Sequence, residues 1–121
     1  MSRDPQLAQK LTEALAGYSA QLNWLHDAYN LSAEKVPKRV KITWPYPLTE
    51  VYFDFLQNDA NIFSESIEFY DGESSDELCE YVAHVVKRFL DHPSRIESLG
   101  TFLKRTELQI LEGDKWISVF D

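Results

Sequence analysis

The chain has 121 residues, among them twenty acids and twelve bases, which give a net charge of -8 at pH 7. The length fits a single domain covering residues 1–121, and a hydrophobic fraction of 44% argues against intrinsic disorder. The negative charge argues against non-specific binding to nucleic acid or to an anionic membrane, because both would repel it. The charge favours a protein partner with a basic surface.

Cys79 is the only cysteine, so the chain cannot form an internal disulfide, and a reducing compartment fits its composition best. The sequence also contains no apolar run of the length that a signal peptide or a membrane span requires. We therefore expect a cytoplasmic protein that uses no cofactor.

The N-terminal segment has the pattern of an amphipathic helix. Asp4 and Pro5 read as a helix cap and a first helical residue. From Leu7 to Tyr29, leucine and tyrosine recur at steps of three and four, which predicts one helix through about residue 30. Gly17 weakens this helix but is not expected to end it.

Three strands are predicted next, because apolar and polar residues alternate in segments 38–44, 51–55 and 62–70. The first two are separated by a proline-rich break after Trp44, and the last two by a polar turn at 57–61. In the third strand, Glu65 falls on the apolar side. It is therefore either near a sheet edge or placed there for a purpose.

The remaining segments predict a second helix and a hairpin. Residues 74–77 match a capping box, and the helix that follows is expected to end at Asp91. Residues 94–105 are expected to form a shorter helix, and 106–120 a β-hairpin. The order helix, three strands, helix, short helix and two strands predicts an α+β fold, with an antiparallel sheet of about five strands and helices packed on one face.

The most unusual feature is the order of the charges, because no Lys or Arg occurs between Lys41 and Lys87. This interval carries ten of the twenty acids: Glu50, Asp54, Asp59, Glu65, Glu68, Asp71, Glu73, Asp76, Glu77 and Glu80. One interpretation is a solvated surface that keeps a small protein soluble. The other is a docking face, where a cationic partner offsets the repulsion between the carboxylates.

Aromatic residues beside these acids are candidate anchors, since interface hot spots use such side chains. If the second and third strands are neighbours, Asp54 and Glu68 lie on one outward face. Tyr46, which stands between two prolines, is the first choice among the anchors. The predicted partner-binding residues are Trp44, Tyr46, Asp54, Glu68, Tyr70, Asp71, Glu73, Asp76 and Glu80.

No motif indicates catalysis or metal binding. The sequence has no glycine-rich phosphate loop, zinc-ligand spacing, nucleophile elbow or calcium-loop order of acids. Each histidine has an acidic neighbour, but catalysis needs a third positioned group that the spacing does not supply. We expect no enzyme. The enzyme alternative would use the acids with His84 around a divalent ion.

Among binding functions, the sequence favours a small acidic inhibitor of the immunity or antitoxin kind, which covers a basic cleft on a toxin. A DNA mimic, whose carboxylates take phosphate positions, belongs to the same group. In size, acidity and element order, the chain also resembles class I type III secretion chaperones, although the predicted order lacks their final helix. That resemblance implies a dimer that exposes apolar grooves to an extended effector, whereas an inhibitor can be a monomer.

Overall fold

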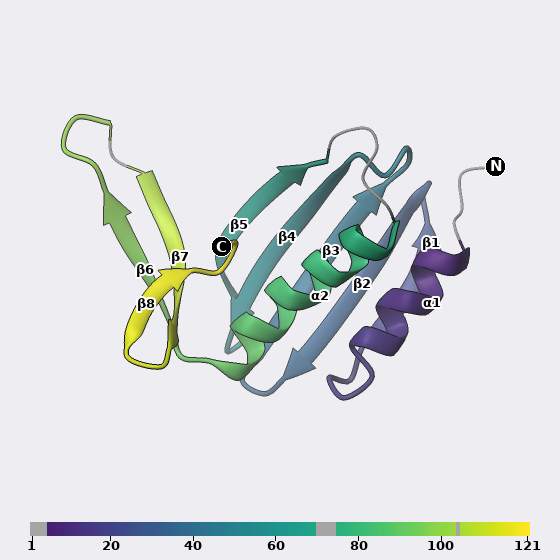
Figure 1. Cartoon of the computed structure of the whole chain (residues 1–121), viewed down its shortest axis with the longest axis horizontal. Helices are drawn as coiled ribbons and strands as arrows, with labels where there is room; N and C mark the ends of the chain where they lie inside the picture. Colours follow the sequence, from purple (N-terminus) through teal and green to yellow (C-terminus); the bar gives the residue numbers. More distant parts are fainter. Residues whose placement is uncertain (1–4, 70–74, 104) are drawn as a thin grey trace.

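Two helices and eight strands make up the computed structural model, which describes residues 5–69, 75–103 and 105–121. In chain order the elements are α1 (Pro5–Ala14), β1 (Gln21–Leu25), β2 (Ala28–Lys35), β3 (Lys38–Pro45), β4 (Glu50–Gln57), β5 (Ala60–Glu68), α2 (Ser75–Asp91), β6 (Ser94–Leu99), β7 (Arg105–Glu112) and β8 (Lys115–Ser118). The strands form a main antiparallel sheet, β1 to β5, and a second antiparallel sheet, β6 to β8 (Figure 1). The predicted α+β class is confirmed.

The main sheet is a meander, in which each strand pairs with the next one along the chain. Two of its turns are tight: His26 and Asp27 join β1 to β2, and Asn58 and Asp59 join β4 to β5. All four residues have positive φ angles, between 53° and 64°. Two central residues of this conformation match the right-handed twist of a hairpin, and Asn and Asp adopt it more readily than most side chains.

The helix predicted through about residue 30 is wrong beyond Ala14, because residues 21–35 form β1 and β2. In these strands alternate side chains face the core, among them Trp24, Tyr29 and Leu31. Leu25, which fits the helical spacing in the sequence, is exposed at the end of β1. Pairing of β2 with β3 imposes a period of two on residues that also fit a period of three to four.

The short helix predicted for 94–105 is also wrong. Residues Ser94–Leu99 form β6, which pairs with β7 in a register that sets Ile96 opposite Leu108. After the strand the chain turns at Gly100, whose φ of 90° lies outside the helical region. The hairpin predicted at the end of the chain is confirmed as β7 and β8.

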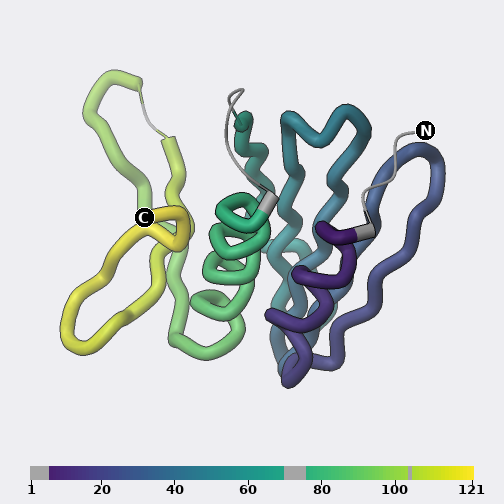
Figure 2. Tube along the Cα trace, turned by 45° about the vertical axis from the view of Figure 1, so that its right-hand side comes forward, coloured from purple at the N-terminus to yellow at the C-terminus, as the bar shows by residue number. Residues whose placement is uncertain are grey.

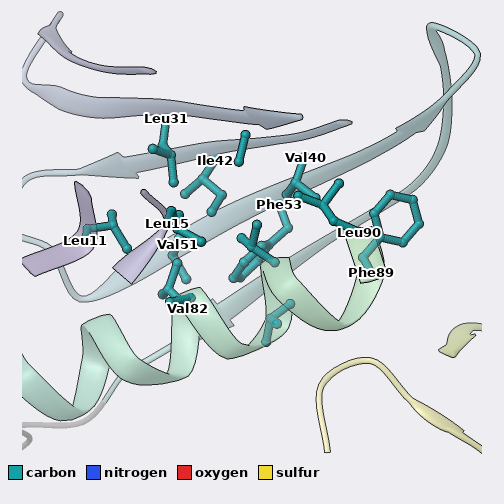
Figure 3. Close-up of a cluster of buried hydrophobic side chains, with 14 of the residues drawn as sticks. Leu11, Leu15, Leu31, Val40, Ile42, Val51, Phe53, Val82, Phe89 and Leu90 are labelled. Atoms are coloured by element: carbon teal, nitrogen blue, oxygen red, sulfur yellow. The ribbon is translucent and has the colours of Figure 1, made fainter. Parts of the chain in front are cut away.

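Both helices pack on the same face of the main sheet, as the sequence predicts (Figures 1 and 2). Leu7 and Leu11 of α1 and Val82 and Phe89 of α2 meet the inward side chains of the strands. Figure 3 shows how the labelled side chains of this cluster meet between the helices and the sheet. Within the described residues, the opposite face of the main sheet has no helix over it.

The second sheet shares this core and is tied to α2. Leu108, Ile110 and Val119 belong to the same buried cluster. The hydroxyl of Tyr81 donates a hydrogen bond of 3.0 Å to the carbonyl oxygen of Phe120. Within the described part of the chain, no helix is long and apolar enough to cross a membrane.

Candidate partner-binding surface

The uncovered face of the main sheet is polar, and the strand register orders its side chains in rows. One row runs from Lys41 on β3 to Asp54 on β4 and Ser64 on β5. The hydroxyl of Ser64 donates a hydrogen bond of 2.7 Å to Oδ1 of Asp54. An antiparallel sheet often has one face on the core and the other in water, so a polar face alone does not identify a binding site.

Two carboxylates meet at one end of this face. Glu68 on β5 lies directly opposite Glu50 on β4, and Tyr52 points to the same side of the sheet. Tyr52 forms a side-chain hydrogen bond with Glu50, which together with the charges of Glu50 and Glu68 raises the pKa of the tyrosine above its usual 10.0. The prediction that Asp54 and Glu68 share the outward face is confirmed by this register.

The fold supplies cations to several acids that have no base near them in the sequence. Lys10 on α1 forms an ion pair with Asp76 on α2. A guanidinium nitrogen of Arg39 lies 3.9 Å from a carboxylate oxygen of Asp59. Asp54 faces Lys41 across β3 and β4. Bases from outside the interval between Lys41 and Lys87 therefore lie close to some of its acids in the folded protein.

Five described acids of this interval form no ion pair with a described base: Glu50, Asp54, Glu65, Glu68 and Glu80. Asp54 faces Lys41 and Glu80 lies on α2, so three of the five, Glu50, Glu65 and Glu68, lie at the outer strands β4 and β5 without a base opposite them. Glu65 lies opposite Phe53, on the inner face, yet it is exposed because β5 is the outermost strand. The three carboxylates therefore lie on both sides of one margin of the sheet. We call Glu50, Tyr52, Glu65 and Glu68 the β5 border. Of the two interpretations of Glu65, the position near an edge is confirmed.

Trp44 is not part of any surface, which corrects its place among the predicted contacts. Its side chain is 0% exposed, and its indole nitrogen donates a hydrogen bond of 3.0 Å to the carbonyl oxygen of Leu48. The inward position of Trp44 follows from the alternation of β3, in which Val40 and Ile42 are also buried. Tyr46, one residue beyond the strand, is 57% exposed.

The other predicted residues are not brought to the β5 border. Asp76 and Glu80 lie on α2 and line a depression of about 430 Å³ beside α1, together with Lys10 and Glu13. This depression is in the helix layer, whereas Glu68 points out from the other face of the sheet. Tyr70, Asp71 and Glu73 were also predicted to bind a partner, and they lie outside the described residues.

The sequence interpretation missed an apolar site at the tip of the β6–β7 hairpin. Phe102 is 98% exposed and Leu103 is 90% exposed. The predicted short helix would have placed them on an ordinary helix surface. The local signal of a turn was Gly100; Ile96 and Leu99 are three positions apart and do not alternate, so the sequence did not indicate a strand before it.

Among the described residues, no group of three or more His, Cys, Asp and Glu side chains is placed to hold a metal ion. Comparisons with models of protein families, with curated proteins and with solved structures found no match to this chain.

Proposed function

We propose that this protein is a small acidic binding module, an inhibitor of the immunity or antitoxin kind, which covers a basic surface of a partner protein with its β5 border. One observation carries the proposal. Glu50 and Glu68 face each other in register, and no described Lys, Arg or His lies within ion-pair distance of either. Like charges directly opposite each other destabilise a strand pair, and a bound cation removes that cost.

Two exposed tyrosines support this location. Tyr52 belongs to the border, and Tyr46 lies in the loop that leads into β4 at Glu50. Tyrosine is common at interface hot spots, because it combines a large apolar ring with a polar hydroxyl. The net charge of -8 would also speed the encounter with a basic partner. A partner that normally binds DNA fits the same border, since carboxylates can occupy phosphate positions.

The test neutralises the border and compares it with a second acid pair. In Glu50→Gln with Glu68→Gln, capture of the partner from an extract of the native source at low salt should be lost. The control is Glu97→Gln with Glu107→Gln, because these two glutamates also face each other, across β6 and β7, but Glu97 already has a cation, Arg95, at 3.7 Å. The captured protein is identified by mass spectrometry, and its basic surface is checked by the salt dependence of binding.

Stability separates a binding role from a structural one. Neutralising Glu50 and Glu68 should leave the free energy of unfolding unchanged or raise it by about 0.5 kcal/mol, since it removes a repulsion. A variant that is at least as stable but does not capture the partner supports the docking role. Capture equal to that of the unchanged protein would show that the border is only a solvated surface.

A second candidate function, a dimeric chaperone for a secreted effector, is favoured by the exposed Phe102 and Leu103. An apolar pair at a hairpin tip can bind an apolar segment of an unfolded client. This candidate predicts a dimer by light scattering, and it predicts that Phe102→Ser with Leu103→Ser stops the protein from keeping its effector soluble. The inhibitor proposal predicts a monomer whose partner binding does not change in that variant.

A further inference from the structure

The outermost strand of the main sheet, β5, has a free edge. It has nine residues and pairs with β4 only. In Figure 1 the hairpin of β6 and β7 lies to the left of β5 and belongs to the second sheet. Proteins usually protect such edges with lysine, proline or a very short strand. β5, whose sequence is ANIFSESIE, has none of these three; what protects its edge is one acid in the inner row, Glu65, and a bulge in its pairing with β4 near Phe55 and Leu56.

The hydrogen bonding shows which residues direct their backbone outward. The amide of Phe69 donates a hydrogen bond of 2.7 Å to the carbonyl oxygen of Thr49, next to the pair of Glu68 and Glu50. Because bonding alternates along an antiparallel strand, Glu65 and Ile67 also direct their backbone groups to β4. Ser64, Ser66 and Glu68 therefore direct theirs away from the sheet.

One of these outward backbone groups, the amide of Ser66, already has a hydrogen-bond partner in a side chain of β5. The amide of Ser66 donates a hydrogen bond of 3.3 Å to Oε1 of its neighbour Glu65. This contact is within the strand, so it stands where a hydrogen bond to a further strand would be made. An incoming strand would displace the carboxylate, and the charge of Glu65 would then need a new partner.

The side chains of β5 determine which side chains an added strand must carry. On the inner face, Glu65 lies between Phe63 and Ile67, which are half-buried. A neutral strand would cover this carboxylate without pairing it, which costs free energy, whereas a strand with a Lys or Arg opposite Glu65 would pair it. On the outer face, a second Lys or Arg of the added strand would pair with Glu68, which has no ion pair among the described residues. A second copy of this chain does not satisfy either need, because its β5 has no base.

We infer that the free edge of β5 binds an extended basic segment of the partner as a sixth strand, an inference that rests on the proposed function. The segment has two basic residues three positions apart, one opposite Glu65 and one opposite Glu68. It has apolar residues opposite Phe63 and Ile67. Backbone hydrogen bonds to Ser64, Ser66 and Glu68 hold the segment, and the two carboxylates select its sequence.

The first test uses a synthetic nine-residue peptide with a fluorescent label and blocked ends. It has lysine opposite Glu65 and Glu68, valine opposite Phe63 and Ile67, and threonine elsewhere. A second peptide has the same sequence, with N-methyl groups on the two backbone amides that face Ser64 and Ser66. The two peptides have equal charge, so purely electrostatic binding would not distinguish them. Strand addition predicts that N-methylation weakens binding, measured by fluorescence anisotropy, by about tenfold or more.

The second test changes the protein. Ser66→Pro removes an outward amide and leaves the bonds between β5 and β4 in place, and proline is tolerated on such an edge. Ser66→Ala, which keeps the amide, is the control. Ser66→Pro should bind the unmethylated peptide about tenfold more weakly than Ser66→Ala does. If Ser66→Pro does not fold by circular dichroism, the comparison of the two peptides decides alone.

The outcomes separate this inference from the proposed function. Equal binding of the two peptides, binding of neither, or full binding by a folded Ser66→Pro would overturn the strand addition. If Ser66→Pro still captures the natural partner while Glu50→Gln with Glu68→Gln does not, the docking function stands and only the strand addition is wrong. If both variants capture the partner, both proposals are wrong.

Discussion

The hydroxyl of Tyr18 donates a hydrogen bond of 2.6 Å to Oδ2 of Asp91, so the segment after α1 is joined to the last residue of α2. Lys35 at the end of β2 donates to the other oxygen of the same carboxylate at 2.9 Å. The side chain of Asp91 therefore connects the segment after α1 and the end of β2 to the end of α2. Burial of Asp91 opposes its ionisation, but the hydrogen bonds from Tyr18 and Lys35 outweigh burial, and the pKa of Asp91 lies below its usual value.

Asp91→Asn should lower the free energy of unfolding by about 1 kcal/mol at pH 7, a modest value because the carboxylate is partly exposed. The folded protein has the lower pKa, so the stabilisation is complete above the pKa of the unfolded chain, about 4, and is lost as the pH falls through the folded value. Urea unfolding at pH 7, 4 and 3 should show the difference between the two proteins shrinking. Asp114→Asn, in an exposed turn, is the control. A difference that stays constant with pH would contradict the prediction.

Lys38 closes the C-terminal end of α2. Its ammonium group donates hydrogen bonds to the carbonyl oxygens of Phe89, at 2.9 Å, and His92, and it lies 4.8 Å from the centre of the Phe89 ring. Lys38→Met would leave these carbonyls without this donor, and we expect a loss of about 1 to 2 kcal/mol in the free energy of unfolding. Lys41→Met, on the exposed face of the same strand, should change it by less than about 0.5 kcal/mol. Equal effects of the two substitutions would show that Lys38 does not stabilise the helix end.

Arg88 holds the second sheet to α2. One of its terminal nitrogens donates to the carbonyl oxygens of Ser118, at 3.3 Å, and Asp121, at 2.6 Å, and its Nε lies 3.5 Å from a carboxylate oxygen of Glu112. Arg88→Met keeps the apolar stem and removes these contacts. Hydrogen exchange of the β7 and β8 amides should then become faster, while exchange in β3 and β4 stays the same. Faster exchange in both sheets would mean that Arg88 supports the whole fold, and not this junction.

Trp44 and Tyr46 should have opposite roles, although only Pro45 separates them. Trp44→Phe removes the buried indole and its hydrogen bond to Leu48, so we expect a loss of about 2 kcal/mol in stability and unchanged capture by the folded protein. Tyr46→Ala should change stability by less than about 0.5 kcal/mol and weaken capture. Urea unfolding and the capture assay measure the two effects. Weakened capture by folded Trp44→Phe would contradict the assignment of Trp44 to the core.

An element could be predicted from the sequence where its apolar residues fit only one spacing, either that of a strand or that of a helix. Residues 38–44 and 51–55 alternate without a competing pattern, so β3 and β4 were found, and α2 ends at Asp91 as predicted. In residues 21–35 the apolar positions fit two periods. Pairing with β3 decides between them, and no local sequence shows that pairing. The same limit applies to β6, which is a strand because β7 lies beside it.

The candidate site was only partly visible for a related reason. A gap in basic residues along the chain says nothing about bases that the fold brings from elsewhere. Lys10 reaches Asp76 from α1, and this pair could not be read from the order of charges. Glu65 was the better signal, because a single acid in an apolar row contradicts its own pattern. The sequence left two interpretations of this acid open, a position near a sheet edge or a placement for a purpose, and the structure places Glu65 on the outermost strand.

The carboxylate of Glu65 has a further consequence for the behaviour of the protein at high concentration. A long strand edge without a charge in its apolar row is a template on which identical chains stack into fibres. With Glu65 in place, each added copy would bring another carboxylate toward the first. The residue that would admit a basic strand therefore also keeps the protein from polymerising on itself. Its replacement by a neutral side chain would remove this repulsion and favour the stacking of copies along the edge of β5.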